Sequence, residues 1–111
     1  MGVRLGASRI QYAAISEAAA ASNELIAGST GNKIIVLNYL LISGGTVNAT
    51  FEDSDGTNLS GALPLVANSG ASFPGNPDSP AFKTASGKGL HLLLSGAVQV
   101  SGHIAYLVVP A

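Results

Sequence analysis

The sequence predicts an all-β fold: an antiparallel β-sandwich, jelly-roll-like, with about eight short strands. Three observations support this class. Apolar runs alternate with turns rich in Gly, Ser, Asn and Pro, and the chain contains 14 glycines. The longest apolar run, residues 33–45 (KIIVLNYLLISGG), is rich in β-branched residues and lacks the regularly spaced polar residues of a surface helix. At 111 residues the chain has the length of one domain.

We expect residues 1–22 to form an N-terminal arm and then a first strand or short helix, and residues 23–111 to form the sandwich. Alternation in residues 9–16 (RIQYAAIS) indicates a strand, whereas the following EAAAAS favours a helix. A helix this short is marginal unless it is packed, so we prefer a strand and a loop. The alanine run at 18–21 fits either a link or a closely packed subunit contact.

The run at 33–45 is predicted to be a central strand with both faces covered. One face would carry Ile34, Val36, Asn38, Leu40 and Ile42, and the other would carry Ile35, Leu37, Tyr39 and Leu41. One face can pack on the partner sheet of the same chain. The second face, Ile35, Leu37, Tyr39 and Leu41, is therefore our candidate subunit interface.

The remaining segments are predicted to be short strands and turns. Residues 46–53 alternate strictly, which predicts Val47, Ala49 and Phe51 inside and Asn48, Thr50 and Glu52 in water. Strands are also expected at 58–66, 89–95 and 98–109, the last with a bulge or close backbone contact at Gly102. Prolines at 74, 77 and 80 indicate an irregular loop.

Composition excludes several classes of function. Only 10% of residues are charged, against about 25% in ordinary domains, while 47% are apolar. The five basic residues form no patch, so nucleic-acid binding is not expected. No run reaches the roughly 20 apolar residues of a membrane span, and no secretory signal is seen. We therefore expect much of the surface to be buried against other protein.

Candidate sites for chemistry are weak. Residues 53–58 (DSDGTN) begin like a calcium loop but lack the distant bidentate carboxylate, so a hairpin turn is preferred. Residues 86–89 (SGKG) lack the spacing of a phosphate-binding loop. His91 and His103 would meet if the last two strands paired, but a third zinc ligand is missing. We expect no enzyme, no cofactor and no metal.

Several pieces of the chain resemble a group of small β-sandwich virion structural proteins of tailed bacteriophages. The matching pieces are Gly31–Lys33, Phe51, Leu59–Leu65, the loop Phe73–Pro80 and Gly87–Ser95. Together they lie within residues 23–109. Proteins of this kind often decorate the head as trimers at three-fold or quasi-three-fold positions of the shell, and no catalytic residues come with the resemblance.

The resemblance implies a head decoration protein on the capsid surface of a virion. Its partners would be copies of itself, as a trimer, and the major capsid protein. Arg4 and Arg9 would then lie in an arm that contacts the capsid. The alternative is a receptor- or carbohydrate-binding β-sandwich module of a head or tail fibre. Sugar-binding faces use exposed aromatic rings, so exposed rings would favour that alternative.

Overall fold

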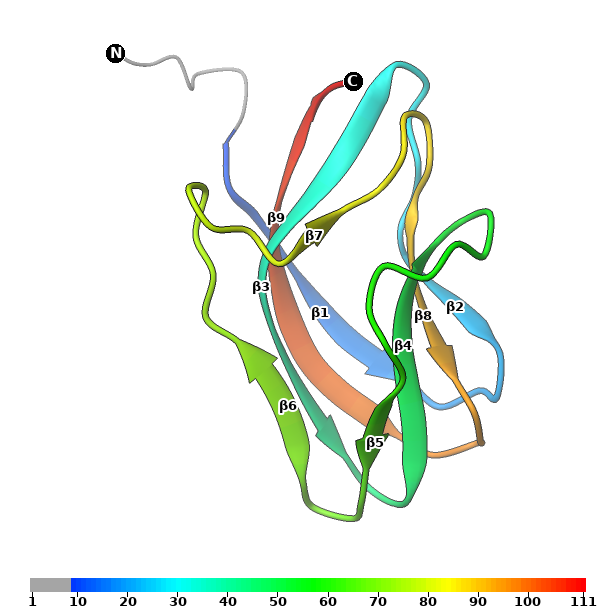
Figure 1. Ribbon diagram of the computed structural model, residues 1–111. Helices are drawn as coiled ribbons and strands as arrows, with labels where there is room; N and C mark the ends of the chain where they lie inside the picture. Colours follow the sequence, from blue (N-terminus) through cyan, green and yellow to red (C-terminus); the bar gives the residue numbers. More distant parts are fainter. Residues whose placement is uncertain (1–8) are drawn as a thin grey trace.

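The computed structural model describes residues 9–111, and this part of the chain forms two antiparallel sheets packed face to face (Figure 1). The strands are β1 (Gln11–Glu17), β2 (Ser22–Ile26), β3 (Asn32–Ser43), β4 (Val47–Asp53), β5 (Leu63–Leu65), β6 (Gly70–Phe73), β7 (Phe82–Lys83), β8 (Leu90–Leu94) and β9 (Val100–Pro110). The prediction of an all-β sandwich is confirmed.

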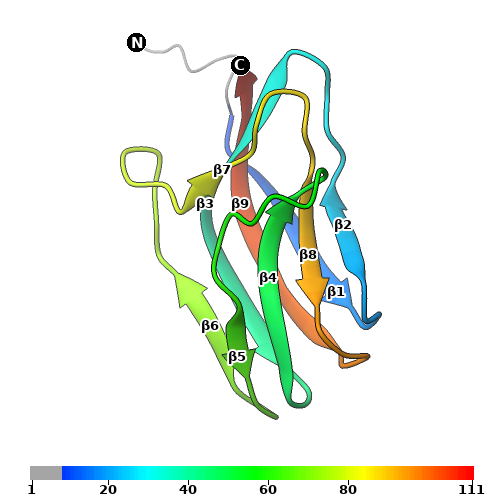
Figure 2. The same ribbon diagram turned by 45° about the vertical axis from the view of Figure 1, so that its right-hand side comes forward.

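The strand order is that of a jelly roll. Sheet A has the order β1-β9-β3-β6, with β7 also paired to β3, and sheet B has the order β2-β8-β4-β5. The first half of the chain thus pairs with the second half running backwards, as in a long hairpin rolled into two layers. Figure 2 shows the strands of sheet B in front of those of sheet A.

The first strand belongs to the sandwich. β1 pairs with β9 along its whole length, from Gln11 opposite Tyr106 to Glu17 opposite Val100. The expectation of a strand is confirmed, the helical alternative is wrong, and the sandwich begins at β1 instead of residue 23. The alanine run at 18–21 is the exposed bend that carries the chain from sheet A to sheet B.

The core lies between the sheets and is made of residues that alternate along each strand. It includes Val36 and Leu41 from β3, Phe51 from β4 and Ile104 from β9, all fully buried. Four aromatic rings pack together near the edge formed by β6 and β7. The ring centroid of Phe51 lies 4.8 Å from that of Tyr39 and 5.0 Å from that of Phe82, and Phe73 stacks on Tyr39 with 6.4 Å between centroids.

The alternation predicted for β4 holds only for its inner face. Val47, Ala49 and Phe51 are buried as expected, and Asn48 on the other face is exposed as expected. Thr50 and Glu52 on that face are buried instead, at 6% and 5% exposure. β4 is flanked by β8 and β5, and the chain that follows it returns alongside, with Asn58 paired to Glu52. Neighbouring side chains therefore cover this face.

The strand predicted at 58–66 is shorter than expected. Only Leu63–Leu65 form a strand beside β4, while residues 58–62 follow its edge as a loop with a single bridge between Asn58 and Glu52. In β9, Gly102 keeps the register on both sides, and a Cβ there would lie 1.8 Å from the carbonyl oxygen of Leu40. Gly102 thus marks a close backbone contact and not a bulge.

Candidate functional site

A β-bulge in β3 determines which of its residues face outwards. The register with β9 shifts between Val36 and Asn38, so that Leu37 and Asn38 both lie opposite Ala105. A bulge of this kind reverses the inward and outward alternation of the strand beyond it. Before the bulge even-numbered residues face the core, and after it odd-numbered residues do.

The bulge separates the four residues predicted to share an interface. Tyr39 and Leu41 pack in the core between the sheets, and Leu41 is fully buried there. Ile35 and Leu37 lie on the opposite side of sheet A, in a small cluster with Ala105, Leu107 and Val109. The prediction that all four share one face is wrong, because the sequence pattern was extended through the extra residue.

The side of sheet A turned away from sheet B is apolar over three neighbouring strands. We call this surface the outer face of sheet A, and it carries Tyr12, Ala14, Ile35, Leu37, Leu40, Ile42, Ala105, Leu107 and Val109. Tyr12 is 74% exposed and Ile42 is 46% exposed, whereas Leu37, Ala105 and Leu107 are buried within the chain, at 1%, 2% and 7% exposure. Large exposed apolar areas in soluble domains mark contacts with other molecules.

Among residues 9–111, the charged groups on the outer face lie at one end. Lys33 lies opposite Val109, and Lys83 lies opposite Ile35. The middle carries His103, with Ala14 opposite it in β1 and Leu40 opposite it in β3. The far end is small and polar, with Ser16 opposite Ser101. The face therefore has an uncharged centre with both lysines at its rim.

Of the two arginines predicted to lie in a capsid-contacting arm, the structure describes only Arg9. Arg4 lies outside the described residues. Arg9 is exposed and comes just before β1, the edge strand of sheet A.

The side of sheet B turned away from sheet A carries polar residues, in contrast to the apolar outer face of sheet A. His91 in β8 lies opposite Glu24 in β2 and opposite Glu52 in β4. Ser22 Oγ donates a hydrogen bond to Glu52 Oε1 at 2.5 Å and lies 3.0 Å from His91 Nδ1. Since the hydroxyl has one proton, which goes to Glu52, Ser22 is placed to accept from an Nδ1–H of His91.

This Ser-His-Glu arrangement differs from a Ser-His-acid catalytic triad. In a catalytic triad the histidine lies between the hydroxyl and the carboxylate, so that it can take the hydroxyl proton. Here Ser22 lies between His91 and Glu52, and the Ser22 hydroxyl donates to the carboxylate. The network therefore joins three strands of sheet B, and its order of groups is not that of a triad.

The two histidines lie on opposite sides of the molecule. His91 is in sheet B and His103 is in sheet A, because β8 and β9 belong to different sheets. The hypothesis that pairing of the last two strands brings them together is wrong. Within residues 9–111 no group of three or more His, Asp or Glu side chains is arranged to hold a metal ion.

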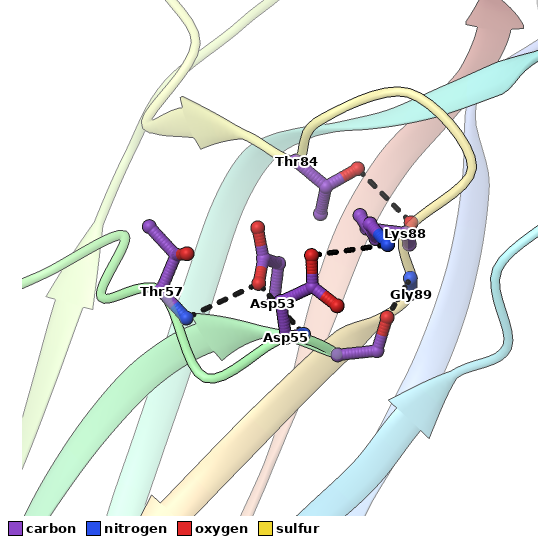
Figure 3. Close-up of polar contacts among 7 residues, drawn as sticks. Asp53, Asp55, Thr57, Thr84, Lys88 and Gly89 are labelled. Atoms are coloured by element: carbon purple, nitrogen blue, oxygen red, sulfur yellow. Dashed lines mark hydrogen bonds and ion pairs between the residues drawn. The ribbon is translucent and has the colours of Figure 1, made fainter.

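The two loops that resembled ion-binding motifs contact each other (Figure 3). Asp53 Oδ1 accepts the backbone N–H groups of Asp55, at 2.9 Å, and Thr57, at 3.2 Å. Asp55 forms an ion pair with Lys88 at 3.0 Å. Asp53 closes its own turn, and the lysine of SGKG neutralises the second carboxylate of DSDG.

Further hydrogen bonds fasten the same loops to the sheets. Ser54 Oγ accepts from the Gly89 N–H at 3.1 Å. The buried Thr84 hydroxyl accepts from the Ile34 N–H at 2.9 Å and donates to the Lys88 carbonyl at 3.1 Å (Figure 3). Residues 53–57 and 84–89 thus hold each other and the adjacent strands together at one end of the sandwich.

Sequence reasoning missed Tyr12, Leu40 and Ile42 as members of the exposed face. Leu40 and Ile42 were assigned to the inner side of β3, and Tyr12 was not assigned to a surface. A signal was present, because the apolar residues of 33–45 exceed what one buried face can use. The sequence offered no way to locate the bulge that decides which of them are exposed.

No family model, no curated protein and no solved structure matches this chain. In the described part of the chain no helix is long and apolar enough to cross a membrane. Residues 9–111 also form no pocket. The outer face of sheet A is accordingly the feature from which we argue function.

Proposed function

We propose that this protein is a virion structural protein of a tailed bacteriophage, a head decoration protein that binds the capsid shell as an oligomer, with a trimer as the expected state. The observation that carries the proposal is a jelly roll with an uncharged, apolar outer face on a chain with only 10% charged residues. Such a surface is suited to contact with protein, and closed oligomers bury it.

The pieces that resemble virion proteins are structural parts of this sandwich. Gly31–Lys33 form the turn into β3, and Phe51 is fully buried in the core. Leu59–Leu65 contain β5, and Gly87–Ser95 contain β8. The resemblance therefore concerns residues that build the fold.

Cementing a shell does not need strong individual contacts. A decoration protein that spans several capsomers gains avidity, because each further contact forms at high effective concentration. A β-sandwich whose loops are cross-linked at one end provides a fixed spacing between such contacts. No catalytic group is needed for this role.

The alternative, a carbohydrate-binding module, requires exposed aromatic rings. Four of the six aromatic rings belong to the core between the sheets, namely Tyr39, Phe51, Phe82 and Tyr106. Among residues 9–111, Tyr12 is the most exposed ring at 74%, and Phe73, at 38%, belongs to the edge strand β6. The aromatic side chains therefore favour the structural role.

The test is to ask whether the chain is on the particle. Virions made from the genome that encodes it should contain the chain in a fixed ratio to the major capsid protein, by quantitative mass spectrometry, and antibodies against it should label heads in electron micrographs. Purified protein should bind shells that lack it. Virions that contain none of the chain would contradict the proposal, and labelling confined to tail fibres would favour the alternative.

A further inference from the structure

The outer face of sheet A has the size of a small protein contact. Its strands contain 7 residues in β1, 12 in β3, 11 in β9, 4 in β6 and 2 in β7. With about 3.3 Å per residue and about 4.8 Å between strands, these strands cover about 570 Å². Part of this area, around Leu37, Ala105 and Leu107, is already buried within the chain. Two such faces together therefore bury at most about 1,100 Å², which is at the lower end of the range for specific interfaces.

The charge distribution on this face suits contact with an identical face. Surfaces with a strong charge of one sign repel their own copies, and like charges placed opposite each other are unfavourable. Here the centre is uncharged, and Lys33 and Lys83 lie together at one end. Two or more copies can join their centres around a symmetry axis while the lysines remain in water at the rim.

His103 is the titratable group at the centre of the face. Its neighbours are Ala14 in β1, Leu40 in β3, and Ser101 and Ala105 along β9. Tyr12 lies diagonally opposite, two residues before Ala14 in β1. Among residues 9–111 the nearest charged group on the face is Lys83, which is level with Leu107, four residues along β9 and two strands away, or about 16 Å from His103. In the described part of the chain, the strand positions next to His103 carry no carboxylate that could pair with a charged imidazole.

We infer that the outer face of sheet A binds a second copy of this chain, and that protonation of His103 weakens this contact as the pH falls. The inference deepens the proposed function by naming its self-contact surface and its regulation, and it rests on that function only for its biological use. The contact itself follows from the size, apolarity and charge of the face.

The direction of the pH effect follows from desolvation. A charged imidazole buried between two apolar faces loses its hydration and gains no partner, so the contact favours neutral His103. The assembly is then most stable above the range in which histidine titrates and is lost as the pH falls through it. Each histidine that must stay neutral lowers the association constant by up to about tenfold for each pH unit below that range.

The experiment measures mass in solution by analytical ultracentrifugation over a range of concentrations, at pH 7.5 and pH 5.0. Four full-length proteins are compared: the wild type, Ile42→Asp, Leu93→Asp and His103→Gln. Ile42 is 46% exposed on the outer face of sheet A, and Leu93 is 36% exposed in β8 of sheet B. Leu93→Asp is the matched control, because it adds the same charge to the opposite sheet.

We expect the wild type and Leu93→Asp to be oligomeric at pH 7.5 and to dissociate at pH 5.0. Ile42→Asp should be monomeric at both, with an unchanged β-sheet circular dichroism spectrum, and His103→Gln should remain oligomeric at pH 5.0. A monomeric wild type at pH 7.5, or an Ile42→Asp oligomer of unchanged mass, overturns the contact. Wild-type mass that is the same at both pH values overturns the role of His103.

The two proposals can fail separately. If the oligomer behaves as expected but virions contain none of the chain, the proposed function fails and the contact stands. If virions carry the chain while the free protein is monomeric, the contact fails and the function stands.

Discussion

The β-bulge at Leu37 makes a sharp prediction for two adjacent residues of β3. Leu41 has 0% of its surface exposed and packs in the core, whereas Ile42 is 46% exposed on the outer face of sheet A. Without the bulge the strand would place Ile42 inside and Leu41 outside. Truncating each residue to alanine therefore tests the register of the strand directly.

The expected magnitudes differ several-fold. Truncating a fully buried leucine to alanine costs about 2.7–5 kcal/mol, from lost burial and the cavity that remains. A substitution at an exposed position usually changes stability by about 0.5 kcal/mol or less. For a domain of this size, 1 kcal/mol corresponds to about 4 °C in Tm. Leu41→Ala should thus lower Tm by about 10–20 °C, and Ile42→Ala by about 2 °C.

The assay is thermal and urea unfolding of both variants beside the wild type, followed by circular dichroism. Self-association stabilises the folded state by mass action, so each curve is repeated at several protein concentrations and compared at the lowest. The reverse order of effects, with Ile42→Ala the more damaging substitution, would refute the bulge and the outer face built on it.

Three further predictions concern other parts of the molecule. Gly102→Ala places a Cβ 1.8 Å from the Leu40 carbonyl oxygen, and the strands must shift, so urea unfolding should show a loss of about 1–3 kcal/mol. Ser22→Ala removes the hydroxyl that donates to the buried Glu52, and thermal unfolding should show a loss of about 1–3 kcal/mol that Ser101→Ala, at an exposed site, does not show. Asp55→Asn breaks the surface ion pair with Lys88, and calorimetry should detect a change of about 1 kcal/mol or less that disappears in high salt.

Local pattern was sufficient to predict the fold class and most of the elements. Runs such as 33–43 and 46–53 combine β-branched residues with turn residues at their ends, and both signals depend only on neighbours in sequence. The structure places strands at Asn32–Ser43 and Val47–Asp53. The loop around the prolines and the turn at 53–57 were recognised for the same reason.

Local pattern could not predict which residues are buried on the side of β4 turned away from the core. Thr50 and Glu52 are buried, although alternation placed them in water. Their cover comes from strands and a loop that are distant in sequence or irregular in pattern. The Ser22–His91–Glu52 network is equally non-local, since it joins residues from β2, β8 and β4.

The sequence by itself determined that this chain folds as a β-sandwich with little charge and with more apolar strand surface than one core can use. The tertiary structure alone decided where the surplus lies. One extra residue at Leu37 turns Tyr39 and Leu41 inwards and leaves Leu40 and Ile42 on the outer face of sheet A. The physical reason is that side chains alternate with a period of two, so a single inserted residue exchanges the two faces of everything that follows.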